Sequence, residues 1–217
     1  MIGDKIKLRD EYVDLAKNVF SEIQRYIDNG IKTISIFGES GCGKSTLAVS
    51  LQHIMHDHGI EVAILHMDDY FILPPKTNHN ARIEMFEHIG PSEVDLHLMD
   101  EHIAKFSQDA EYLHKPLVNY EANSISEEVM DISNIDILIV EGTYGGLLKN
   151  PDLSVMIDRN YMQTRQARIE RNRDPIIPFN EKVLGLEHEM ISSHKSLADI
   201  IVTADKEVII NEKSHSN

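Results

Sequence analysis

The chain is poor in cysteine and in basic residues, and it has no long apolar run. Its one cysteine, Cys42, cannot form an intramolecular disulfide or build a zinc site from several cysteines. No apolar run approaches the ~20 residues needed to cross a bilayer, and residues 1–10 are too polar for a secretory signal. The sequence therefore predicts a soluble, cytoplasmic protein that does not enter the membrane.

Basic residues are outnumbered by acidic ones, 21 against 36, which gives a formal net charge of −15. Such a surface repels nucleic-acid phosphates and anionic lipids, so it argues against nucleic acid or membrane surfaces as partners. With 217 residues, of which 41% are hydrophobic and 26% charged, the chain can bury a core, which excludes disorder throughout. No repeat or linker divides it, so we expect one domain over residues 1–217 and leave a homo-oligomer open.

The few arginines are unevenly distributed. Five of the eight lie within fifteen residues, namely Arg159, Arg165, Arg168, Arg171 and Arg173. Arginine presents a planar set of donors that suits phosphate oxygens. The alternative is a solvated helix face that balances nearby acidic residues.

The hydrophobic pattern alternates between helices and short buried strands, which predicts an α/β fold with a mostly parallel sheet and helices on both faces. The expected helices are 13–27 (within an N-terminal segment, 1–30, packed on the domain), one following a glycine-rich turn at 38–43, Ser92–Phe106, 160–172 and 180–196. The expected strands are 31–37, 62–67, 135–140, 155–157, 200–202 and 208–210, with a small hairpin or irregular excursion at 115–130 and a long loop at 72–91. Ser92 and Asp95 have the spacing of a helix-capping box.

The glycine-rich turn carries the most specific motif in the chain. Residues 38–45 read Gly-Glu-Ser-Gly-Cys-Gly-Lys-Ser and fit the P-loop (Walker A) pattern G-x-x-x-x-G-K-[ST] in full. In this pattern backbone N–H groups surround a phosphate, the lysine reaches the β and γ phosphates, and the hydroxyl coordinates Mg²⁺. The predicted ATP-binding residues are Gly38, Ser40, Gly41, Cys42, Gly43, Lys44, Ser45 and Thr46.

Cys42 lies inside this loop, where a small residue is needed. A nucleophilic role is not expected. The helix end and Lys44 favour a lower pKa of its thiol, and whether Cys42 is redox-sensitive stays open. Oxidation or alkylation at Cys42 would then block ATP binding.

Two acidic sites follow predicted strands. Asp68 and Asp69 come after strand 62–67, and Glu141 after strand 135–140. Because ligands of open parallel sheets bind beyond the carboxyl ends of the strands, one carboxylate can hold Mg²⁺ while another takes a proton from an attacking hydroxyl. Loop solvation or helix capping is the alternative. The chain has neither an N-K-x-D motif nor a D-x-x-G switch after a strand, which argues against a GTPase.

An ordered series of segments resembles the phosphoribulokinase/uridine kinase family. The matching segments are Gly38–Thr46, Met67–Phe71, Gly90–Asp95, Lys115–Tyr120, Ile139–Gly142, Asp158–Asp174 and Ala198–Ile201. Together they run from about residue 33 to 203. The resemblance implies a three-layer P-loop NTPase fold with a lid helix in the region 160–180, and an ATP-dependent kinase for a small molecule that bears a hydroxyl group.

The resemblance also implies individual roles. Asp68 matches the catalytic base, and Glu141, with Ser45, the Mg²⁺ site. Lys44, Arg165 and Arg168 match cationic residues that act on the phosphates, Arg165 also touching the acceptor. Predicted substrate contacts are Phe71, Asp95, Tyr120 and Arg165; Arg82 is a further candidate that the uridine kinase pattern does not explain.

The acceptor stays open at this stage. Uridine or a related nucleoside is the leading candidate, although Glu121–Ile125 stands where uridine kinases place a histidine and an arginine. Pantothenate or another small alcohol is the alternative within the family. A nucleotide-binding regulator or an ATPase without acceptor is the rival class, and Asp68 together with an arginine-rich lid argues against it.

Overall fold

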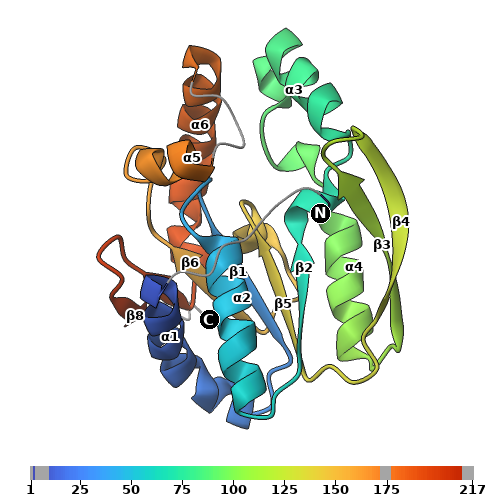
Figure 1. Ribbon diagram of the computed structural model, residues 1–217, viewed down its shortest axis with the longest axis vertical. Helices are drawn as coiled ribbons and strands as arrows, with labels where there is room; N and C mark the ends of the chain where they lie inside the picture. Colours follow the sequence, from blue (N-terminus) through green and yellow to red (C-terminus); the bar gives the residue numbers. More distant parts are fainter. Residues whose placement is uncertain (1, 3–9, 172–176, 212–217) are drawn as a thin grey trace, which may run out of the picture.

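The central feature is a six-stranded sheet with the order β2-β5-β1-β6-β7-β8 (Figure 1). The computed structural model describes residues 2, 10–171 and 177–211. Neighbouring strands are parallel except for β7 and β8. The strands are β1 (Thr33–Gly38), β2 (Val62–His66), β5 (Ile137–Gly142), β6 (Leu153–Ile157), β7 (Ile200–Val202) and β8 (Val208–Ile210). The predicted mostly parallel sheet is confirmed.

Helices cover both faces of this sheet. On one face, α1 (Asp10–Asp28) and α2 (Lys44–Asp57) pack on Ile34 and Ile36 of β1. On the other face, α4 (Leu96–Ser107) packs in a second core cluster that includes Phe37 of the same strand. All six residues of β1 are buried. A strand buried on both sides is typical of the central position in a three-layer α/β fold.

The predicted excursion at 115–130 is an antiparallel hairpin beside α4, formed by β3 (Tyr112–Asn119) and β4 (Ser124–Asp131) (Figure 1). Its first strand contacts the short 3₁₀ segment Met67–Tyr70 that follows β2. Val118 N donates to Asp69 Oδ1 at 3.0 Å, which ties the hairpin to the end of β2.

The prediction of a long loop at 72–91 is wrong. This segment contains helix α3 (Pro75–Glu84) and a 3₁₀ turn at Phe86–His88. Pro75 occupies the first turn of α3, where its missing N–H is not needed and its fixed φ suits a helix. The prolines therefore start this helix instead of excluding one.

The predicted start of the next helix at Ser92 is also wrong. The helix α4 begins at Leu96, and the Asp95 carboxylate caps it by accepting a hydrogen bond from Leu98 N at 2.9 Å. A separate 3₁₀ turn, Pro91–Glu93, precedes it, and Glu93 accepts from Gly90 N at 2.8 Å. Two acidic side chains thus divide the expected single helix into two elements.

The arginine-rich region forms α5 (Arg165–Arg171), which is shorter than the predicted helix 160–172. Residues 172–176, with Arg173, lie outside the described part of the chain. Then α6 (Pro178–Ile191) runs into a 3₁₀ segment, Ser192–Leu197, where one helix was expected to 196. In Figure 1, α3 and α6 both project beyond the same edge of the sheet. Within the described ranges, no helix combines the length and the apolar character that a membrane span requires.

Candidate active site

A cavity of about 230 Å³ lies at the carboxyl ends of β1, β2 and β5. Parallel α/β sheets bind ligands at this edge. One side is formed by the phosphate loop (residues 38–45) and the strand ends, and the opposite side by α3, α6 and the hairpin. The lining residues are Ser40, Gly41, Lys44, Ser45, Asp68, Phe71, Leu73, Pro75, Asn78, His79, Arg82, Val118, Tyr120, Glu141, Thr143, Arg168, Asn180, Val183, Leu184 and Glu187.

The phosphate loop connects β1 to α2, and its backbone requires glycine. Gly41 and Gly43 have φ angles of 75° and 107°. A Cβ on Gly43 would lie 2.1 Å from the hydroxyl of Tyr12, which comes from α1. The loop therefore leaves its backbone N–H groups near the start of α2, an arrangement that binds phosphate.

The predicted nucleotide residues divide into two groups. Ser40, Gly41, Lys44 and Ser45 line the cavity, whereas Gly38, Cys42, Gly43 and Thr46 shape the loop without lining it. Lys44 Nζ donates to the carbonyl oxygen of Glu39 at 3.0 Å, so the ammonium group lies over the loop itself.

The structure does not support a lowered pKa for the Cys42 thiol. Only 1% of the residue is exposed, and burial raises the pKa of its thiol although the charge of Lys44 acts in the opposite direction. The sequence pattern showed the helix end and the lysine but not the burial.

We therefore expect iodoacetamide to leave Cys42 unmodified in the native protein and to alkylate it after denaturation, because the thiolate is the reactive form. Mass spectrometry of both samples measures this. Rapid alkylation of the native protein would contradict the burial of this thiol.

Ser45 and Glu141, the predicted metal ligands, are in contact. Ser45 Oγ donates to Glu141 Oε1 at 3.0 Å, and His66 Nδ1 lies 2.7 Å from the same oxygen. Burial alone would lower the pKa of His66, but the hydrogen bond to Glu141 outweighs it and raises the pKa. Sequence reasoning missed His66, although its position as the last residue of β2 could have indicated it.

A hydroxyl and a carboxylate are the hard oxygen donors that a divalent cation such as Mg²⁺ prefers, so these residues fit one. Among the described residues, no group of three or more His, Cys, Asp or Glu side chains could hold a metal alone. Further ligands would have to come from phosphate oxygens and water, as is usual for Mg²⁺.

The two neighbouring aspartates after β2 face different surroundings. Asp68 lines the cavity. Asp69 is fully buried and accepts hydrogen bonds from Val118 N and from Lys115 Nζ, the latter at 3.1 Å. They lie in a 3₁₀ turn, and not in an extended chain, where neighbouring side chains point to opposite faces. The catalytic role of Asp68 stays a prediction.

The predicted acceptor residues are not all brought together. Phe71 and Tyr120, from the family resemblance, and the further candidate Arg82 line the cavity. Asp95 does not line it: it is exposed and caps α4, and its contact with an acceptor hydroxyl stays a prediction.

A buried set of polar side chains, which the sequence did not indicate as a group, lines the cavity beside α3 and α6 or supports that lining. We call Asn78, Arg82, Glu93 and Glu187 the polar wall. Arg82 binds both oxygens of Glu93, through Nε at 2.5 Å and Nη2 at 2.9 Å, and Nη2 also donates to Glu187 Oε1 at 3.1 Å. Burial opposes the charge of Arg82, but the carboxylates outweigh it and raise the pKa of the guanidinium.

Of the two predicted lid arginines, only Arg168 reaches the cavity. Its Nη1 donates to Glu181 Oε1 at 2.9 Å and its Nη2 to Tyr161 O at 3.0 Å. A Cβ on Gly41 would lie 2.6 Å from Arg168 Cγ, so this side chain packs directly on the phosphate loop. Arg165, at the start of α5, is exposed and does not line the cavity.

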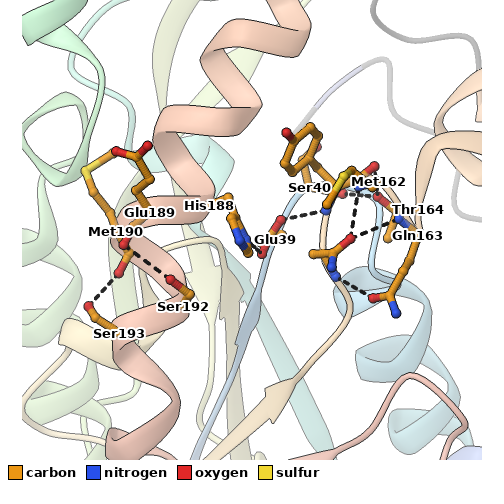
Figure 2. A network of polar contacts seen from close by, with 12 residues as sticks. Glu39, Ser40, Met162, Gln163, Thr164, His188, Glu189, Met190, Ser192 and Ser193 are labelled. Atoms are coloured by element: carbon orange, nitrogen blue, oxygen red, sulfur yellow. Dashed lines mark hydrogen bonds and ion pairs between the residues drawn. The ribbon is translucent and has the colours of Figure 1, made fainter.

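The lid region is also joined to the phosphate loop by hydrogen bonds (Figure 2). Thr164 Oγ1 donates to Ser40 O at 3.0 Å. The buried carboxylate of Glu39 accepts from Tyr161 N at 2.6 Å and lies 2.6 Å from His188 Nδ1 of α6. One loop residue therefore holds both the start of the lid and α6.

Known proteins with related sequences are kinases of small molecules by name. The chain is 32% identical over 210 residues to a bifunctional alpha-galactosidase/sucrose kinase of Mediterraneibacter gnavus. That match covers 89% of this chain but only 22% of the relative, so the chain spans about a fifth of that protein. It is 29% identical over 184 residues to a uridine kinase of Clostridium novyi, covering 78% of this chain and 85% of the relative.

Solved structures share the fold at lower sequence identity. A possible uridine kinase from Bacillus stearothermophilus matches with a TM-score of 0.65 at 21% identity, over 88% of this chain and 98% of that one. A phosphoribulokinase from Rhodobacter spheroides matches with a TM-score of 0.62 at 15% identity, over 80% and 70%. The P-loop NTPase fold is thus confirmed. The model of the Phosphoribulokinase / Uridine kinase family matches residues 33–174, and the chain belongs to this family of P-loop kinases.

Proposed function

We propose that the chain is an ATP-dependent phosphotransferase, acting as one kinase domain, that moves the γ-phosphoryl group of ATP to a hydroxyl group of a small molecule. One observation carries this proposal. The same cavity joins the phosphate loop and Asp68 to a separate aromatic and polar side that includes Phe71, Tyr120 and the polar wall. A regulator or a simple ATPase needs only the first of these two halves.

Each of these lining residues has a separate role in the proposed reaction. The loop backbone and Lys44 bind the phosphates, and Ser45 and Glu141 hold Mg²⁺, which neutralises phosphate charge when bound. Asp68 accepts the proton of the attacking hydroxyl. Arg168 stabilises the charge that develops on the transferring group, after exchanging its bonds to Glu181 for bonds to phosphate.

Two acceptor classes have support. Phe71 and Tyr120, with several relatives named uridine kinase, favour uridine or another nucleoside. The polar wall favours a sugar, and so does the relative whose name includes sucrose kinase, because sugars are bound by buried carboxylate, amide and guanidinium groups.

A coupled ADP-release assay tests this function. Purified protein with ATP and Mg²⁺ is given nucleosides, sugars and small alcohols one at a time. We expect ADP release to depend on one acceptor class and the phosphorylated acceptor to appear in equal amount. Steady ADP release that no acceptor changes would overturn the proposal and favour the ATPase.

The lid arginines give a further test. Arg168→Ala is expected to lower kcat by roughly 10²-fold with little change in the KM for ATP, because its charge acts on the transferring phosphoryl group. Arg165→Ala is expected to lower kcat less, since its side chain is exposed. Steady-state kinetics with both variants measure this. If Arg168→Ala changes only the KM for ATP, the assignment of this arginine to the transfer step is wrong.

A further inference from the structure

The polar wall is assembled from three separate segments. Arg82 comes from α3, Glu93 from the turn before α4, and Glu187 from α6, 105 residues after Arg82. The side chains of Arg82, Glu93 and Glu187 are 18%, 0% and 10% exposed. Burying three charged groups is costly unless they are paired, so their arrangement is well defined.

The two carboxylates of the wall have different surroundings. Glu93 is saturated: besides Arg82 it accepts from Asn78 Nδ2 at 2.7 Å and from Gly90 N at 2.8 Å, and it does not line the cavity. Glu187 lines the cavity, and within the described residues its carboxylate accepts a hydrogen bond from Arg82 only. An ionised carboxylate has about four acceptor positions. Glu187 therefore has accepting capacity left on the cavity side.

The wall holds two carboxylates and one guanidinium, so it is negative when both carboxylates are ionised. Burial raises the pKa of Glu187, and the charge of Arg82 opposes this shift. A further polar group lies beside the wall. Tyr144 is 1% exposed, its hydroxyl has no hydrogen-bond partner in the described part of the chain, and it interacts electrostatically with Glu187, Glu93 and Arg82. Burial and the two carboxylates raise the pKa of this hydroxyl, so it stays neutral and adds no negative charge.

Among the described lining residues, no lysine or arginine other than Arg82 bonds to Glu187. Lys44 lies on the phosphate loop, from where its charge still acts on Glu187, and Arg168 pairs with Glu181. His79 packs edge-on against Phe179, with ring centroids 5.3 Å apart. A carboxylate or phosphate on the acceptor would therefore lie close to Glu187, and in the described part of the lining each lysine and arginine is already bonded to another group.

We propose that the phosphoryl acceptor is an uncharged, hydroxyl-rich molecule, and that Glu187, positioned by Arg82, accepts hydrogen bonds from its hydroxyl groups. This inference rests on the kinase function proposed above and narrows it. Hydroxyl groups of a free sugar or of a ribose donate to a carboxylate, whereas an anionic alcohol is repelled by it. The proposal therefore excludes phosphosugars and hydroxy acids, including pantothenate, as phosphoryl acceptors.

Matched pairs of acceptors test, on the wild-type protein, whether a negative charge on the acceptor lowers the activity. Each pair differs mainly in one anionic group: fructose and fructose 6-phosphate, uridine and orotidine, pantothenol and pantothenate. In the pair that contains the preferred acceptor class, we expect kcat/KM to be about 10²-fold higher for the neutral member, because like-charge contacts are strongly unfavourable. Sucrose and uridine, compared directly, decide between a sugar and a nucleoside. A charged member that is the better substrate would overturn the inference.

The role of Glu187 is tested by Glu187→Gln, with Glu189→Gln as the matched control on an exposed position of the same helix. Glu187→Gln is expected to raise the KM for the neutral acceptor about tenfold or more, the usual effect of a lost hydrogen bond to a charged group. The variant should also discriminate less against the charged acceptor of the matched pair, and its KM for ATP should be unchanged. Glu189→Gln should match the wild type in all three.

The outcomes distinguish a failure of the proposed kinase function from a failure of the inference about the acceptor. If no acceptor in the panel stimulates ADP release, the kinase function fails and this inference with it. If the enzyme is active but prefers an anionic acceptor, or if Glu187→Gln folds and keeps both the KM and the discrimination, only this inference fails. Should Glu187→Gln not fold, as judged by thermal melting, the wild-type acceptor pairs decide alone.

Discussion

Lys44→Ala is expected to lower kcat by about 10²- to 10³-fold, equivalent to the loss of one fixed electrostatic contact in a transition state. Lys44 supplies the one side-chain positive charge of the phosphate loop, residues 38–45. Its Nζ donates to Glu39 O at 3.0 Å, so the ammonium group is already held over the loop where phosphates would bind. Alanine removes the charge without adding volume, and helix α2 should form normally because alanine favours helices.

The measurement is kcat with saturating ATP and the best acceptor, together with ATP binding by calorimetry. Lys105→Ala, an exposed lysine on α4, is the matched control and should match the wild type. If Lys44→Ala keeps most of the activity, the ATP site is not at the phosphate loop.

The parts of this molecule that the sequence predicts well are those set by local patterns. The buried strands β1 and β5 are short apolar runs, and the phosphate loop has a fixed spacing between its glycines and Lys44. Each of these patterns depends on residues within about ten positions of one another. The lining of the cavity by Asp68 and Glu141 also agrees with the rule that ligands bind beyond the carboxyl ends of parallel strands.

The parts that the sequence did not predict depend on distant contacts. Helix α3 is weakly amphipathic and rich in Asn and His, so its sequence resembled a loop. Its helical state places Arg82 beside Glu93 and Glu187, and the latter is 105 positions away. No pattern in one segment indicates such a wall. The same holds for Glu39, whose bond to His188 spans 149 positions.

Burial and local hydrogen bonds also affect what two of the predicted site residues do. The charge of Lys44 and the start of α2 favour a low pKa for the Cys42 thiol, but desolvation, which a sequence does not show, has the larger effect. Asp95 matched a family position for substrate contact, and its carboxylate is instead used to cap α4. A motif thus identifies a position in the chain, while the local hydrogen bonds decide what its side chain does.

Asp68→Asn is expected to lower kcat by a factor on the order of 10² to 10⁴, the usual contribution of a general base, with ATP binding retained. Asp68 follows β2 and lines the cavity between the phosphate loop and the acceptor side. A hydroxyl acceptor must lose its proton as it attacks the γ phosphate, and a carboxylate within hydrogen-bond reach can accept it. Asparagine keeps the shape but lacks the basic oxygen, so the fold should be unchanged.

The neighbouring residue provides the control for this variant. Asp69→Asn makes the same chemical change at a carboxylate that is bound to Lys115 and Val118 N, away from the cavity. It should destabilise the fold by about 2 kcal/mol, because a buried ion pair loses one charge, but the folded enzyme should keep its kcat within a few-fold. Thermal melting and kinetics of both variants measure these effects. If Asp68→Asn is fully active while Asp69→Asn is folded but inactive, the proton acceptor is Asp69 and the assignment to Asp68 is wrong. Only one of the two carboxylates can face the acceptor.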